Sequence, residues 1–153
     1  MRKIILSLSV LVLYSCTQQH YYNQYRSVNL KSWKATDTLS FPIEIKEADK
    51  QFQYSISVRY EESYEFSNLW VKVFVNGNGI DTSFRYNLPL FKNDGKPFGE
   101  KSGSLITQTI PLKTDLPLSQ KGKYEIKLVQ LMRKDPLNGI SDVGIFVDAK
   151  TGK

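Results

Sequence analysis

Short segments in which apolar and polar residues alternate are the feature that most restricts the fold of this chain. The clearest covers residues 53–60, and a longer one covers residues 80–90. Successive side chains of a strand point to opposite faces of its sheet, so this period of two predicts strands with one buried face. In the first segment the apolar positions are Tyr54, Ile56, Val58 and Tyr60.

Turn signals separate these segments along the whole chain. Asn76-Gly77-Asn78-Gly79 predicts a hairpin turn, because asparagine and glycine tolerate positive φ. Pro42 lacks a backbone N–H, so its segment is predicted to be an edge strand, or Pro42 to stand at a strand start. No stretch shows a helical stripe, and the pattern predicts an all-β antiparallel β-sandwich, jelly-roll or immunoglobulin-like, with about seven to eight strands. The predicted strands are 39–45, 53–60, 67–76, 80–90, 105–112, 124–133 and 143–147.

The segment 67–76 differs from the others because both of its faces carry large apolar residues. Trp70 and Phe74 lie opposite a face of leucine and valine. We expect them to form a second core layer that covers this strand on both sides. The alternative is an exposed aromatic that stacks on a sugar ring or anchors a protein partner. Phe98 stands between Pro97 and Gly99. Its side chain could equally well pack beneath its own loop or contact a binding partner.

The first fifteen residues have the pattern of a lipoprotein signal peptide. Arg2 and Lys3 precede an apolar run over residues 4–13. This run is about half of the roughly 20 residues that a membrane-spanning helix needs. Leu13-Tyr14-Ser15-Cys16 then matches the site where the lipoprotein signal peptidase cleaves before a lipid-modified cysteine. The alternative is an ordinary signal peptide followed by a chance cysteine.

Cys16 is the only cysteine of the chain, so no intrachain disulfide and no thiolate cluster can form. We expect a diacylglycerol on Cys16 and no other cofactor. Residues 16–34 are predicted to be a lipidated tether with an aromatic lead-in, and residues 35–153 a single domain. The net charge is +6, and the basic residues are scattered among acids, which argues against nucleic-acid binding.

Candidate catalytic residues are few. His20 is the only histidine and lies in the predicted tether, which argues against a catalytic triad or a zinc site in the domain. The glutamates within residues 61–65, and Asp135 with Asp142, are interpreted as solvated strand ends and turn caps. A calcium loop that includes Asn138 is a weaker alternative. We therefore predict no catalytic and no metal-binding residue, and no enzymatic activity.

Segments far apart in the sequence share a pattern with one known family. The most specific is residues 132–144, MRKDPLNGISDVG. The others are residues 64–70, YEFSNLW, then Asp81-Thr82, and residues 95–99, GKPFG. Together these segments resemble the gliding-motility lipoprotein GldH family of the Bacteroidota.

Two further features bear on this resemblance. Tyr25 and Trp33 fit the aromatic start that follows the lipid-bearing cysteine in the family. At Phe98 this chain departs from the tryptophan that the family usually has, which weakens any specific stacking role for that loop. The resemblance nevertheless spans nearly the whole mature chain.

The resemblance implies a cell-envelope lipoprotein with no catalytic residues. Its signature glycines, Gly139 and Gly144, are expected to provide backbone freedom. Arg133 closes one strand and Asp142 begins the next, so we expect an opposite-charge pair between them. The candidate partner-binding residues are Phe98, Trp70 and Tyr64.

The functional hypothesis is a non-enzymatic accessory or scaffold lipoprotein linked to gliding motility and to type IX secretion. Relatives also occur in bacteria that do not glide. The alternative is a carbohydrate-binding β-sandwich module, with a glycan instead of an envelope protein as its partner. No acidic residue stands in residues 17–21, just after the cysteine. This favours an outer-membrane anchor that faces the periplasm over export to the cell surface.

Overall fold

The computed structural model of the chain describes residues 21–48, 51–113 and 116–150. Over these ranges the fold is all-β and antiparallel, as predicted, with one 3₁₀ turn, η1 (Asn29–Lys31). The predicted signal peptide, Cys16 and His20 lie outside the described residues. The strands are β1 (Tyr22–Ser27), β2 (Ser32–Trp33), β3 (Leu39–Ile45), β4 (Phe52–Glu61), β5 (Asn68–Gly77), β6 (Ile80–Pro89), β7 (Glu100–Ser102), β8 (Leu105–Pro111), β9 (Gly122–Gln130), β10 (Leu137–Asn138) and β11 (Ile140–Ala149).

The described part of the chain has eleven strands, more than the seven to eight predicted. The alternating segments account for β3 to β6, β8, β9 and β11. The additional strands are β1, which has no regular burial pattern, and β2, β7 and β10, which are only two or three residues long. β1 and β2 lie within residues 16–34, so the aromatic lead-in contributes strands to the sandwich.

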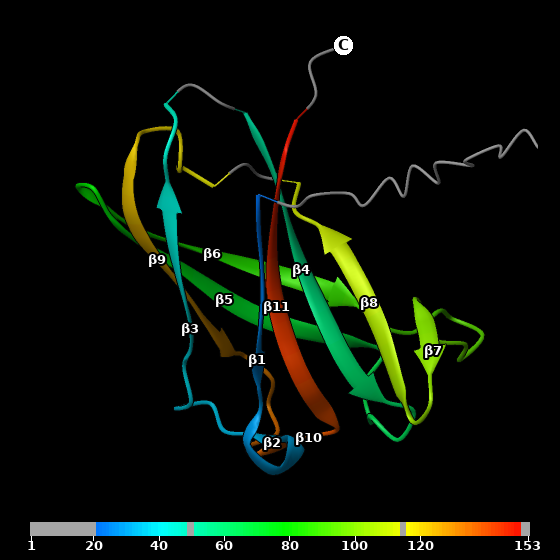
Figure 1. Ribbon diagram of the computed structural model, residues 1–153. Helices are drawn as coiled ribbons and strands as arrows, with labels where there is room; N and C mark the ends of the chain where they lie inside the picture. The colour runs from blue at the N-terminus through cyan, green and yellow to red at the C-terminus, as the bar shows by residue number, and fades with distance from the viewer. Residues whose placement is uncertain (1–20, 49–50, 114–115, 151–153) are drawn as a thin grey trace, which may run out of the picture.

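Two antiparallel sheets face each other and form the sandwich (Figure 1). The five-stranded sheet has the order β1-β11-β4-β8-β7, and the four-stranded sheet has the order β3-β9-β5-β6. A two-stranded ribbon, β10-β2, lies at one end of the sandwich (Figure 1). β3 is an edge strand, the first of the two alternatives that Pro42 allowed, and Pro42 stands in its middle.

The core lies between the two sheets and follows the predicted alternation. On β5, Val71, Val73 and Val75 are fully buried. On β4, facing them from the other sheet, the four apolar residues of the segment 53–60 are at most 3% exposed. Burying a side chain of this kind contributes about 1.5–3 kcal/mol, so this layer is the main source of stability.

The second core layer expected around Trp70 and Phe74 is not formed. Trp70 is 42% exposed, and Phe74 is only half-buried on the outer face of β5. The two sheets cover only the inner faces, and among the described residues no helix or third sheet packs over this one. The Lys72 ammonium instead lies 4.6 Å from the centre of the Phe74 ring, and the lysine stem provides partial cover.

One open side of the sandwich is bridged by side chains of β1 and the residue before it. The Arg26 Nε donates a hydrogen bond of 2.8 Å to the carbonyl oxygen of Ser40 on β3. The Tyr21 hydroxyl donates to the carbonyl oxygen of Glu44 at 3.1 Å and accepts from the N–H of Lys46 at 2.8 Å. These contacts satisfy backbone groups at the β3 edge and join the two sheets.

The opposite side of the sandwich is less closed. β6 ends the four-stranded sheet there, and its inward-facing residues Ile80, Phe84 and Tyr86 are only half-buried. The neighbouring residues of β5 are fully buried, so the apolar core thins out at β6.

Candidate functional site

Three connections meet at one end of the sandwich and build the candidate site. They are residues 62–67 between β4 and β5, residues 90–99 between β6 and β7, and residues 131–139 between β9 and β11. The N–H groups of Leu90 and Phe91 both donate to the carbonyl oxygen of Ser67 at 2.9 Å. The backbone therefore ties the first two connections together directly.

Two buried tyrosines fix the same loops from inside. The Tyr60 hydroxyl lies 2.6 Å from the carbonyl oxygen of Leu90 and 2.8 Å from that of Phe98. Its single hydrogen donates to one of them at a time. The Tyr64 hydroxyl donates to the carbonyl oxygen of Asn68 at 3.0 Å. Burial raises the pKa of Tyr60 to about 12 and also raises the pKa of Tyr64, so both remain neutral donors at physiological pH.

An aromatic cluster surrounds these hydroxyl groups. The ring centres of Tyr64 and Phe66 are 5.8 Å apart, and those of Tyr60 and Phe91 are 5.4 Å apart, both with an edge-to-face orientation. This geometry adds roughly 0.5–1.5 kcal/mol per pair to the burial of the rings. The cluster therefore stabilises the three connections at this end of the sandwich with packed aromatic rings.

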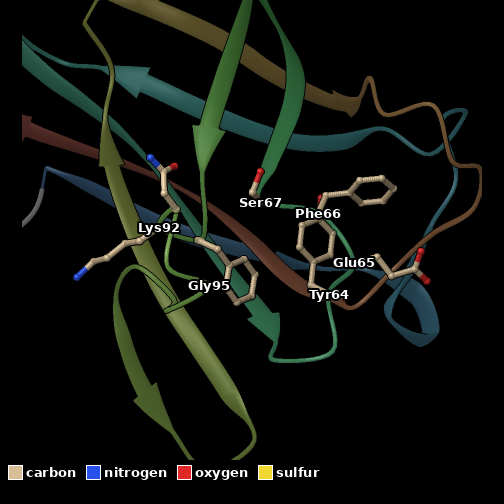
Figure 2. A pocket seen from close by; sticks show the side chains of 8 residues that line it. Tyr64, Glu65, Phe66, Ser67, Lys92 and Gly95 are labelled. Atoms are coloured by element: carbon tan, nitrogen blue, oxygen red, sulfur yellow. The ribbon is translucent and has the colours of Figure 1, made fainter.

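A cavity of about 540 Å³ opens beside this cluster, and we name it the loop-end cavity. Figure 2 shows the Tyr64 and Phe66 rings at its wall and the Lys92 side chain pointing away from them. Phe66 and Phe91 are half-buried, so apolar surface at the cavity remains open to solvent. The lining residues are Tyr64, Glu65, Phe66, Ser67, Phe91, Lys92, Asn93 and Gly95.

The glutamates near this end are engaged in surface ion pairs. Glu62 lies 2.7 Å from the ammonium of Lys101, and Glu65 is bound by Lys134. Lys31 binds Glu61, and this hydrogen bond holds the pKa of that carboxyl below its usual range. Each carboxylate therefore has its own lysine. Among the described residues, no three His, Cys, Asp or Glu side chains gather in a way that would hold a metal ion.

The three candidate partner-binding residues do not lie together. Tyr64 lines the loop-end cavity but is only 5% exposed. Phe98 is half-buried and lines an adjoining hollow of about 580 Å³, which shares Phe91 and Lys92 with the cavity. Trp70 lies elsewhere, on a groove beside β6. The structure thus brings Tyr64 and Phe98 to one end and leaves Trp70 outside it.

The expected charge pair between Arg133 and Asp142 is not formed. Arg133 is exposed in the connection before β10, whereas Asp142 lies opposite Arg59 in the β11–β4 register. The Asp142 carboxylate accepts hydrogen bonds of 2.7 Å from the hydroxyls of Ser27 and Ser141. Residues 135–139 form a turn between Arg133 and Asp142. This turn is longer than the two-residue turn that would place the two side chains opposite each other on paired strands.

The two signature glycines have different structural roles. Gly139 has φ of +88°, a conformation that glycine adopts readily, and an added Cβ would lie 3.3 Å from the Cα of Tyr64. Gly144 lies in β11 without a positive φ, and an added Cβ would lie 2.8 Å from the ring of Tyr25. Gly144 is therefore needed for space and not for backbone freedom.

Sequence reasoning did not identify Phe66, Phe91 or Lys92 as site residues. Phe66 stands within the segment 64–70, and the family resemblance of this segment could have marked Phe66 as a candidate site residue. Phe91 directly follows the alternating segment 80–90 and breaks its alternation, because it stands next to the apolar Leu90, but no local motif marks it as a site residue. Its role depends on how the connection folds back onto Tyr60.

Across the described ranges, no helix is long and apolar enough to cross a bilayer. The predicted attachment point, Cys16, lies outside these ranges. Membrane attachment through the lipid therefore stays a prediction from the sequence.

Comparison with known proteins finds solved structures of low sequence identity and one family. The solved structure titled "Xyl-CBM35 in complex with glucuronic acid containing disaccharide" is 17% identical, with 76% of this chain and 72% of that chain covered and a TM-score of 0.41. "CBM35 from Cellvibrio japonicus Abf62" is 18% identical, with 76% and 71% coverage and a TM-score of 0.39.

The sequence comparisons identify a relative and a family that match most of the chain. The gliding motility lipoprotein GldH of Flavobacterium johnsoniae is 24% identical over an alignment of 154 positions, which covers 95% of each chain. The profile of the family described as GldH lipoprotein matches residues 20–147. The match includes every strand of the sandwich except the last two residues of β11. This chain belongs to the GldH lipoprotein family.

Proposed function

We propose that this protein is a non-enzymatic accessory or scaffold lipoprotein that serves gliding motility and the type IX secretion machinery. Family membership supports a role in the cell envelope, and the Flavobacterium johnsoniae relative is named for gliding motility. The paired glutamates at the loop end are also consistent with a structural role for the carboxylates closest to the cavity.

The proposed attachment is a diacylglycerol on Cys16, with no other cofactor. The apolar run over residues 4–13 and the residues just before Cys16 support it. Two or more acyl chains on one residue anchor a protein stably, whereas a single chain anchors it only weakly. The absence of an acid in residues 17–21 favours the periplasmic face of the outer membrane.

The proposed docking site for an envelope protein is the loop-end cavity. One observation carries this proposal: three of the four segments with the family resemblance, residues 64–70, 95–99 and 132–144, have residues at this end of the sandwich, whereas Asp81-Thr82 lies near the β5–β6 turn. Half-buried aromatic side chains within a polar rim are the usual composition of a binding hot spot. Phe66 and Phe91 provide the aromatic surface, and Lys92 and Asn93 lie at the rim.

Affinity purification of the lipidated protein from its own cells, followed by mass spectrometry, tests this proposal. We expect recovery of gliding or type IX secretion proteins with the wild type and at least about tenfold less with Phe66→Ser, as for a hot-spot residue. Trp70→Ala is the matched control, because it removes an exposed aromatic that does not line the cavity. Equal recovery with Phe66→Ser would reject the cavity as the docking site, and absence of any envelope protein with the wild type would reject the scaffold role.

A glycan-binding role remains the second candidate, and the exposure of Trp70 favours it. Trp70 is 42% exposed on an open sheet face, with the half-buried Phe74 four residues along the same strand. Such rings can stack on sugars. A glycan array probed with the wild type and with Trp70→Ala tests this role. Binding that depends on Trp70 would support it, and no binding to any glycan would remove it.

A further inference from the structure

The outer edge of β6 is a free strand edge. β6 ends the four-stranded sheet, and within the described ranges no strand pairs with its outer side (Figure 1). Ten consecutive residue pairs join it to β5 without a register shift. The other edge of this sheet, β3, contains Pro42 and is bridged by Arg26. A long, regular edge without such protection offers its backbone groups to another strand.

The inner face of β6 also lacks full cover. Ile80, Phe84 and Tyr86 pack against the core but stay half-buried. The buried hydroxyl of Tyr86 has no hydrogen-bond partner among the described residues. A strand added beside β6 would extend the sheet and cover these apolar side chains.

The β5–β6 turn determines which backbone groups of β6 point outward. Asn78 and Gly79 form a two-residue turn with φ of +50° and +79°. In such a hairpin the flanking pair, Gly77 and Ile80, exchanges hydrogen bonds, and every second residue along β6 repeats this pattern. The residues whose backbone groups face away from β5 are therefore Asp81, Ser83, Arg85 and Asn87.

Two opposite charges stand on this edge. Asp81 and Arg85 are both exposed on the outer face, four residues apart. Arg85 lies opposite Lys72 on β5, and among the described residues it has no acidic partner. Like charges directly opposite each other destabilise a sheet. Asp81 accepts a hydrogen bond of 2.7 Å from the Asn76 amide and keeps its other oxygen available.

We propose that two copies of this protein associate through β6, antiparallel, around a two-fold axis at Ser83. In this register Asp81 of each copy lies opposite Arg85 of the other copy, and both side chains point to the same face of the joined sheets. Two Asp–Arg pairs result, and each places a carboxylate beside the Lys72–Arg85 pair. The two four-stranded sheets become one continuous sheet of eight strands.

The inner face supports the same register. There Ile80 lies opposite Tyr86 of the second copy, and Thr82 lies opposite Phe84 of the second copy. Aromatic residues paired with β-branched ones are favourable cross-strand neighbours, worth roughly 0.2–1 kcal/mol each. Among antiparallel registers that use the outward backbone groups, this is the one that sets Asp81 opposite Arg85. A register centred on Arg85 would instead place two arginines together.

Cysteine cross-linking of the full-length lipidated protein, in membranes of its own cells, tests the register. Hydrogen-bonded partners in an antiparallel pair have Cα atoms about 5.5 Å apart, within disulfide range. We expect Ser83→Cys to give a disulfide-linked dimer under mild oxidation. Asn87→Cys, on the same edge, is the matched control, because the register separates its two copies by about 26 Å. Cross-linking of Asn87→Cys to the same extent as Ser83→Cys would overturn the proposal.

Charge exchange tests the energetics in the detergent-solubilised protein. We expect Asp81→Arg and Arg85→Asp each to raise the dimer dissociation constant about tenfold or more, since each turns two attractive pairs into repulsive ones. The double variant should recover most of the loss. Light scattering that shows a monomer for the wild type at every concentration would overturn the proposal. So would a Ser83→Cys cross-link only to a protein of different mass, which would assign the edge to another partner.

Discussion

The Tyr25 ring occupies the space above Gly144, and this contact shows how a single missing side chain shapes the outer face of the five-stranded sheet. The ring passes over Gly144 so that the Tyr25 hydroxyl reaches the Ser57 hydroxyl at 2.8 Å. The Arg59 guanidinium lies 3.9 Å from the ring centre, and the Phe146 ring lies edge-on at 5.4 Å. Any side chain at position 144 would displace the tyrosine that holds this group together.

Gly144→Ala is therefore expected to lower the free energy of unfolding by about 1–3 kcal/mol, the usual cost of overpacking. Thermal or denaturant unfolding measures it. The double variant with Tyr25→Ala should lose less than the sum of the two single changes, because removal of the ring frees the space for the new Cβ. Strict additivity would show that the Gly144–Tyr25 contact is not the cause.

The burial of the Tyr60 hydroxyl predicts how the free energy of unfolding changes at alkaline pH. Its pKa rises from 10.0 in the unfolded chain to about 12 in the folded protein, because the hydroxyl is buried. A folded pKa above the unfolded value means that this stabilisation is complete below pH 10 and is lost as the pH rises towards 12. Tyr60→Phe should therefore make stability fall less steeply between pH 10 and 12. Denaturant titrations across this interval, compared with the wild type, measure the slope, and an unchanged slope would contradict the assignment.

Among the strands longer than three residues, β1 is the one that periodicity could not reveal. Its burial pattern along Tyr22–Ser27 shows no alternation, because Tyr25 and Arg26 both pack although they point to opposite faces. It forms an edge strand by pairing with β11, on residues that are over a hundred positions away in the sequence. β1 stabilises the sandwich through Arg26, whose side chain donates a hydrogen bond to Ser40 on the other sheet.

Arg26→Ala should consequently weaken the bridged side of the sandwich. The change removes the hydrogen bond to Ser40 and a guanidinium that lies 5.4 Å from the centre of the Phe41 ring. We expect a loss of about 1–3 kcal/mol, as for a charged hydrogen bond, together with faster amide hydrogen exchange in β1 and β3. Asn23→Ala, an exposed change in the same strand, is the control and should have little effect. Equal exchange in both variants would show that the bridge does not hold the sheets together.

The strands with a regular pattern could be predicted, and the contacts between loops could not. The sequences of β4 and β6 alternate because one face of each packs on the core, although Ser55 and Ser57 on the other face of β4 are buried as well. Trp70 looked like a core residue because its neighbours are apolar, yet its burial depends on whether a further layer exists. The loop-end cavity joins Tyr64 to Phe91, and only the folded connections bring them together. The resemblance included segments that meet at the loop end without giving their geometry.

At the scale of the whole molecule, the attachment point and the proposed docking site belong to separate parts of the chain. The lipid is predicted at Cys16, whereas the loop-end cavity is built by connections after β4 and β6. The β6 edge is a third surface, on the less closed side of the sandwich. Membrane attachment and partner binding should therefore respond to different substitutions.

Cys16→Ser tests this separation, because a serine cannot take the thioether-linked diacylglycerol. We expect the variant protein to lose fatty-acid labelling and to move from the membrane fraction to the soluble fraction. Phe66→Ser should keep both the label and the membrane fraction and lose only its partner. Fractionation of cells grown with a labelled fatty acid measures both properties at once. A Cys16→Ser protein that stays labelled in the membrane would place the anchor elsewhere in the chain. A Phe66→Ser protein found in the soluble fraction would mean that the domain itself contributes to attachment.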